Sequence, residues 1–281
     1  MRTLLTLIFI AGFMSVAAQM PIEVKIESRP SSLGIQTAFE VLIPQATTND
    51  AIDLWKKTII PGGLFKKEPK MEKVKDEWIV NNVLISDITN LPLNVFTQVT
   101  SFPGNIYVRI FLQSEGGFLG SSGSSPETTD AAVRFIRNYA VDLYRKTVEK
   151  ELKVEQKNLK ELENDLSKLT KQNKSYNRKI SEAQKDEREL KVEAVQNEEL
   201  LKNQENVIEL DNPEGKGKTY QEQLEKQAKD TEKDLNKAQK SQKKFNRKVN
   251  KNEKAQREKS NEIEKQKIRV EEVKTKLNNI R

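Results

Sequence analysis

The sequence predicts an α+β fold, in which a two-layer α/β sandwich head is followed by a long antiparallel coiled-coil helical hairpin. Nearly all Gly, Pro, Trp and Phe residues precede residue 125, whereas Lys, Glu, Gln, Asn and Leu dominate after it. From Val148 onward, apolar residues alternate at spacings of three and four, which specifies a left-handed coiled coil. Pro213, Gly215 and Gly217 interrupt this repeat and favour a turn.

The head is expected to alternate strands with two helices. Helical spacing of Ile52, Trp55 and Ile59 predicts a helix over 48–60, which Pro61 ends. Ser125 and Pro126 supply a cap and a first helical residue for the long helix. Apolar runs bounded by turn residues predict strands over 22–28, 36–43, 77–85, 93–100 and 106–112. Between the last strand and the long helix, 116–124 is expected to be a flexible linker, or a mobile binding lip bearing Phe118.

The two helical seams predict an antiparallel pairing about the turn at 211–218. Folding the chain back places Leu166 opposite Ile263, Ile180 opposite Val249 and Ala194 opposite Leu235. Residues 147–215 hold 13 Lys and Arg against 17 Asp and Glu, and residues 216–281 hold 21 against 11. Opposite net charges on the two helices favour pairing within one chain. The expected domains are therefore a signal peptide at 1–18, a head at 19–146 that includes the start of the long helix, and the hairpin at 147–281.

The first residues have the pattern of a secretory signal. A charged Arg2, an apolar stretch from Leu4 to Val16 and the small residues Ala17 and Ala18 follow one another. The apolar stretch is shorter than the ~20 residues that a membrane-spanning helix needs. We therefore expect an exported protein of the periplasm or cell surface, cleaved after Ala18.

The composition argues against most enzyme classes. The 281 residues include no His and no Cys. This removes the usual general base, the common nucleophile pairs, thiol chemistry and most transition-metal sites. Gly217-Lys218-Thr219 matches part of a phosphate-binding loop, but a helix rather than a strand precedes it. We expect no catalytic activity, no cofactor and no metal.

The middle of the second helix carries the candidate binding residues. Between 237 and 259 it holds ten Lys and Arg against two Glu, and the facing stretch 170–192 is also net positive. Such a run either keeps a solvated surface soluble or binds an acidic partner by charge attraction. The residues expected to bind an acidic partner are Lys237, Lys240, Lys243, Lys244, Arg247, Lys248, Lys251, Lys254 and Arg257. In the same region the seam turns polar at Asn173 and Asn252, which predicts register control or a hinge.

The layout resembles a family of uncharacterised exported proteins of Gram-negative bacteria. The segment from Arg29 through Trp55-Lys56-Lys57, the later strands, Gly116-Gly117 and the coiled coil carry this resemblance, which implies no activity. The basic hairpin is also similar to the arms of periplasmic holdase chaperones and to the hairpins of membrane-fusion adaptor proteins.

Together these features predict an exported structural and interaction protein, with the coiled coil as a spacer or docking surface. Its partner would be a protein or an acidic envelope component, with peripheral membrane contact possible in principle and no nucleic acid expected. The alternative is a periplasmic holdase-type chaperone with helical arms, which requires oligomerisation through the head.

Overall fold

The structure, a computed structural model, describes residues 22–60, 69–210 and 216–281, with the side chains of 204–210 and 216–220 left out. The expected signal peptide and residues 211–215 of the expected turn lie outside the described residues. The chain divides into two compact units. The head comprises the described residues up to 153 together with 271–281, and the arm comprises 154–270.

The head contains a seven-stranded antiparallel sheet with the order β1-β2-β6-β5-β4-β3, and β7 pairs with β6. The strands are β1 (Val24–Ser31), β2 (Gly34–Pro44), β3 (Met71–Val74), β4 (Glu77–Val83), β5 (Leu93–Phe102), β6 (Asn105–Ser114) and β7 (Gly117–Phe118). Five of them match the expected strands to within a few residues, whereas β3 and β7 were not expected. Both are short, at four and two residues, so neither displays a clear alternating pattern.

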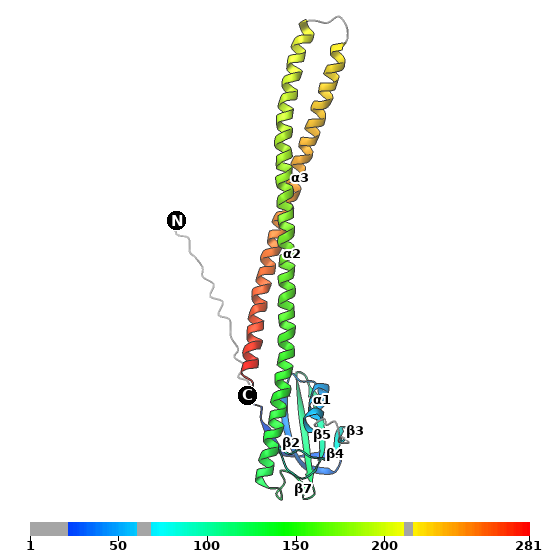
Figure 1. Cartoon of the computed structure of the whole chain (residues 1–281), viewed down its shortest axis with the longest axis vertical. Helices are drawn as coiled ribbons and strands as arrows, with labels where there is room; N and C mark the ends of the chain where they lie inside the picture. The colour runs from blue at the N-terminus through cyan, green and yellow to red at the C-terminus, as the bar shows by residue number, and fades with distance from the viewer. Residues whose placement is uncertain (1–21, 61–68, 211–215) are drawn as a thin grey trace, which may run out of the picture. The chain divides into compact units, whose positions relative to one another are not determined.

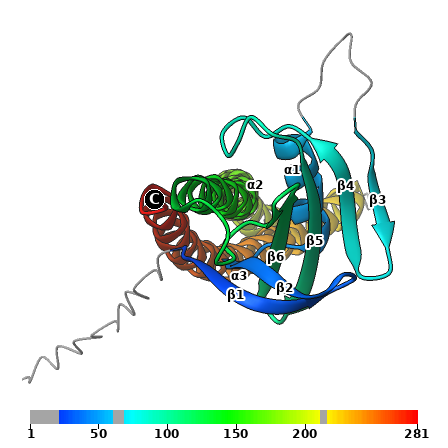
Figure 2. The ribbon, with the colours of Figure 1, turned by 90° about the horizontal axis from the view of Figure 1, so that it is seen from below.

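Two helices cover one face of this sheet, as Figure 2 shows: α1 (Thr48–Ile59) and the first part of α2 (Pro126–Leu210). The Thr47 side chain accepts from the backbone N–H of Asp50 and so caps α1. Trp55 is fully buried against the sheet, and its indole N–H donates to Thr97 Oγ1 over 2.8 Å. The buried Tyr139 of α2 contacts the Trp55 ring edge-on and donates to the Ala51 carbonyl. The expected α+β sandwich is confirmed.

The last residues of α3 (Lys216–Asn278), together with those that follow them, also belong to the head. Val273 and Ile280 are buried in the same apolar core as the sheet and helices, and Leu277 packs against it. Arg145 donates to the Ile280 carbonyl over 3.3 Å, and Arg137 donates to the Arg281 carbonyl over 3.0 Å. The head core is therefore built from two stretches that are far apart in the sequence.

The segment expected as a flexible linker is instead packed against the sheet. Gly117 and Phe118 pair with β6, and Leu119 is buried. Gly120 has φ +82°, and a Cβ atom there would lie 3.0 Å from the Thr37 Cγ2 atom. Glycine is required at this close approach. Phe118 therefore does not project as a mobile lip.

In the arm, α2 and α3 lie side by side and run in opposite directions (Figure 1). Every seam residue that the sequence predicts between 155 and 201 and between 224 and 270 is buried or half-buried. Ile180, Val249 and Ile263 are among the most buried. The antiparallel helical hairpin is confirmed, with α3 beginning at Lys216, three residues before the expected start at Thr219.

Candidate binding surface for an acidic partner

The predicted cations of α3 lie on the side of the helix that faces solvent. The seam passes through Gln242, Phe245, Val249 and Asn252, all buried or half-buried. All nine predicted residues are exposed, as expected for positions between seam residues. They are Lys237, Lys240, Lys243, Lys244, Arg247, Lys248, Lys251, Lys254 and Arg257. We call this set the cationic surface.

Most residues of the cationic surface form no ion pair. Lys237 pairs with Asp234 at 2.7 Å, and Lys254 approaches Glu258 at 3.9 Å. The hydrogen bond with Asp234 also raises the pKa of Lys237. Within the described part of the chain no ion pair is made by seven of the nine side chains, namely Lys240, Lys243, Lys244, Arg247, Lys248, Lys251 and Arg257. Their charge is available to a partner.

Lys248 differs from the other members because it lies over aromatic rings at the seam. Its Nζ atom is 5.4 Å from the centre of the Tyr176 ring and 5.5 Å from that of Phe245. Lys179 of α2 lies 5.2 Å from the Phe245 ring centre. A cation over an aromatic face is attracted by the electron density of the ring. These two lysines therefore contribute to the seam as well as to the charge of the region.

On the facing stretch of α2, several of the cations form ion pairs with acidic residues of the same helix. Arg178 pairs with Glu182 at 2.9 Å, Lys185 with Glu189 at 3.6 Å, and Lys191 with Glu187 at 2.8 Å. Each pair is spaced by four residues along the helix, the spacing that brings side chains together. Lys171, Lys174, Lys179 and Arg188 form no ion pair among the described residues, so unpaired cations lie on both helices but are more numerous on α3.

Polar residues occupy the seam beneath the cationic surface. Asn252 is buried, donates to Gln172 Oε1 over 3.4 Å and accepts from Gln256 Nε2 over 2.5 Å. Lys259 reaches the edge of the seam and bonds Glu262 at 2.7 Å, which raises the pKa of Lys259. Hydrogen-bonded polar seam residues of this kind fix the register of a coiled coil at some cost in stability.

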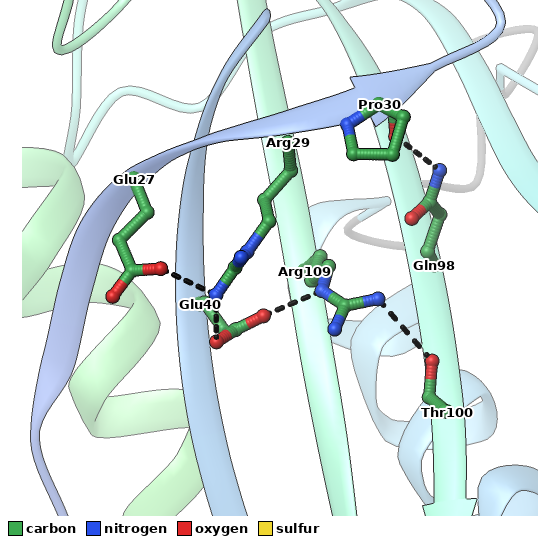
Figure 3. Close-up of polar contacts among 7 residues, drawn as sticks. All are labelled: Glu27, Arg29, Pro30, Glu40, Gln98, Thr100 and Arg109. Carbon is green, nitrogen blue, oxygen red and sulfur yellow. Dashed lines mark hydrogen bonds and ion pairs between the residues drawn. The ribbon is translucent and has the colours of Figure 1, made fainter. Parts of the chain in front are cut away.

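A second cluster, which the sequence analysis did not identify, lies on the sheet face opposite α1 and α2 (Figure 3). Here β1 crosses in front of β6 and β5. The Glu40 carboxylate accepts from Arg29 Nη2 over 3.0 Å and from Arg109 Nε over 2.5 Å. Arg29 also contacts Glu27, and Arg109 reaches Thr100.

Glu40 is the buried centre of this cluster. Burial by itself would raise the pKa of Glu40, but the bonds from Arg109 and Arg29 outweigh it and lower the pKa. Gln98 Nε2 donates to the Pro30 carbonyl and to Glu77 Oε1, so the end of β1 is tied to β5 and β4. With both carboxylate oxygens of Glu40 bound to arginines, the cluster is suited to holding strands together.

Other chemistry has little support in the described residues. Across the described ranges, no group of three or more acidic side chains could hold a metal ion. No helix within those ranges is long and apolar enough to span a membrane. The cationic surface is a candidate site because of its exposed, unpaired charge. Comparison with protein-family models matched no family, and comparison with curated proteins found no relative.

Proposed function

We propose that this chain is an exported interaction protein that docks onto an acidic partner through the cationic surface of its coiled-coil arm. One observation carries the proposal: seven exposed cations between Lys240 and Arg257 have no ion-pair partner among the described residues. Like charges crowded on one helix repel one another and cost stability. An acidic partner would relieve that repulsion while gaining attraction.

The arm supports this function better than the holdase alternative. A holdase needs a continuous apolar surface that can grip unfolded chains. The exposed large apolar residues of the arm are few: Val192, Val195 and Leu200 lie on one stretch of α2, and Val154 and Ile268 stand apart from them. The exposed charge, by contrast, is continuous.

The test is the affinity of the whole protein for a fluorescent sulfated dextran, measured by anisotropy. The test variant replaces five of these seven residues, Lys240, Lys243, Lys244, Arg247 and Lys251, with glutamine. Glutamine and lysine have similar helix propensities, so helicity should be retained. We expect affinity for the dextran to fall by about tenfold or more, because bound cations release counterions from a polyanion.

A matched control removes the same amount of charge from elsewhere on α3. It replaces Lys226, Lys229, Lys233, Lys265 and Arg269, all exposed, with glutamine. This control should bind almost as tightly as the parent. The proposal is wrong if the parent does not bind, or if both variants lose affinity equally and so respond only to net charge.

A further inference from the structure

The outward positions of α3 form three parallel rows of charge. Between 236 and 257, the positions that point away from the seam hold eight Lys or Arg, two Asn and no acid. One row contains Lys237, Lys244 and Lys251, the central row contains Lys240, Arg247 and Lys254, and the third contains Lys243 and Arg257, with Asn236 and Asn250 at its other positions. At ~1.5 Å per residue, the rows extend for about 30 Å along the helix.

The width of this array favours a broad partner over a thin one. In a heptad repeat, adjacent outward rows are separated by about 50° around the helix, so the three rows cover about 100°. Lysine and arginine carry their charge at the end of long flexible side chains. All three rows can therefore reach one flat plane at the same time, whereas a single extended polymer follows one row.

The array, meaning the ten outward positions between 236 and 257, also lacks the features of a helix face that inserts into a bilayer. Its ten outward positions include no apolar or aromatic residue. Helices that bury a face in a bilayer carry Trp, Phe or Leu on that face. A contact made by this array would stay at the level of charged headgroups, where clusters of four to eight Lys and Arg recognise anionic lipids.

We propose that the partner is the surface of an anionic lipid bilayer, contacted side-on by the outer face of α3. This inference rests on the proposed function, because it names the partner of the same surface. The α2 side is the less favourable face, because acids are interspersed among its cations and pair with Arg178 and Lys185, whereas the outward rows of α3 hold no acid.

The experiment measures co-sedimentation of the whole protein with vesicles of phosphatidylcholine alone or mixed with phosphatidylglycerol. The parent should bind only the anionic vesicles, and high salt should release it because the Debye length shortens. Replacing Lys240, Lys243, Lys244, Arg247 and Lys251 with glutamine should weaken vesicle binding by about a hundredfold or more. The control with five substitutions at Lys226, Lys229, Lys233, Lys265 and Arg269, which lie among acidic residues beyond the array, should lose much less affinity than the test variant.

A second measurement tests which face meets the lipid. The natural chain has no cysteine, so Asn250→Cys and Ser181→Cys each give one labelling site. Both positions are exposed, Asn250 within the array and Ser181 on the outward side of α2. Energy transfer to a headgroup-labelled lipid should be strong from Asn250→Cys and weak from Ser181→Cys.

The outcomes distinguish docking onto acidic partners in general from docking onto an anionic lipid bilayer. Binding to sulfated dextran without binding to anionic vesicles would overturn the lipid assignment and leave the proposed function standing. Failure to bind either probe would overturn both. Equal energy transfer from the two labels would overturn contact through the α3 face.

Discussion

The side-chain amide of Gln242 in α3 donates to the main-chain carbonyl of Ala183 in α2, with 3.3 Å between the two atoms. The same amide also bonds the Glu187 carboxylate. Gln242 therefore sits between two successive seam positions of the other helix. This is the arrangement of a knob in a hole, and it fixes the register of the hairpin.

Cysteine pairs placed across this contact should crosslink within one chain. Ala183→Cys combined with Gln242→Cys, treated with a short bismaleimide, should give a crosslinked monomer by mass spectrometry. Moving the second cysteine to the exposed Lys243 should give much less product, because that side chain points away from the seam. Crosslinked dimers as the main product would contradict the hairpin.

The sequence predicted the antiparallel pairing but not the details of the register. The register expected from the sequence pairs Ile180 with Val249 and Ala194 with Leu235. In that register, Gln242 lies opposite Glu187 and not also against Ala183. Seam periodicity repeats every three or four residues, so it identifies the side of each helix that is buried. It cannot show that one knob rests between two positions of its partner.

Because of the same periodicity, the sequence did not show that the C-terminal end of α3 belongs to the head. Val273, Leu277 and Ile280 continue the heptad spacing of the arm without a break, yet they pack in the head core. A repeat shows that a helix face is buried but does not reveal what buries it. The expected boundary at residue 146 therefore leaves out part of the head core.

The contribution of this C-terminal segment to the stability of the head can be measured with two isoleucine substitutions, one at a buried and one at an exposed position. Ile280→Ala should lower the free energy of unfolding by about 2–3 kcal/mol, because Ile280 is buried in the head core. Ile268→Ala is the matched control, since Ile268 is 59% exposed, and it should change stability by less than about 0.5 kcal/mol. Chemical denaturation of the two full-length variants checks the difference. Equal effects would show that the C-terminal segment does not pack as described.

The Glu40 cluster was missed because its members come from separate strands. Arg29, Glu40 and Arg109 lie on β1, β2 and β6, and only the strand order brings them together. One signal was present, since Glu40 stands between the apolar Phe39 and Val41. A charge in such a position on a central strand implies a partner on a neighbouring strand.

Glu40→Gln should destabilise the head by about 2 kcal/mol at pH 7, because it leaves two arginines without their shared carboxylate. The pKa of Glu40 is lowered below its ordinary value of 4.5 in the folded protein. Its stabilising effect is therefore complete above that value and is lost as the pH falls through the lowered pKa. Denaturant unfolding at several pH values should show a weaker acid dependence in the variant.

The control for this substitution is Glu27→Gln. Glu27 contacts the same Arg29, but its side chain is 40% exposed. It should cost less than about 1 kcal/mol, as is typical of surface ion pairs. Equal effects of the two substitutions would show that Glu40 does not stabilise the head by joining Arg29 and Arg109. An unchanged loss of stability at acidic pH in Glu40→Gln would show the same.

Replacing Asn252 tests the role of the polar seam beneath the cationic surface. Asn252→Leu should stabilise the arm by about 1 kcal/mol, because an apolar residue at such a position is favoured energetically. Thermal loss of the helical circular dichroism signal measures this. The substitution Asn250→Leu, on the exposed side of the same helix, should leave the transition unchanged. A lower transition temperature for Asn252→Leu would mean that the hydrogen bonds of Asn252 outweigh its desolvation cost.

Lysine footprinting of the intact protein reports directly where an acidic partner touches the chain. The protein is acetylated briefly with and without sulfated dextran, and the modification of each lysine is quantified by mass spectrometry. If the cationic surface is the docking site, Lys240, Lys243, Lys244 and Lys251 should lose reactivity severalfold while Lys226 and Lys229 keep theirs. Equal protection of all these lysines, or protection only outside the cationic surface, would contradict it.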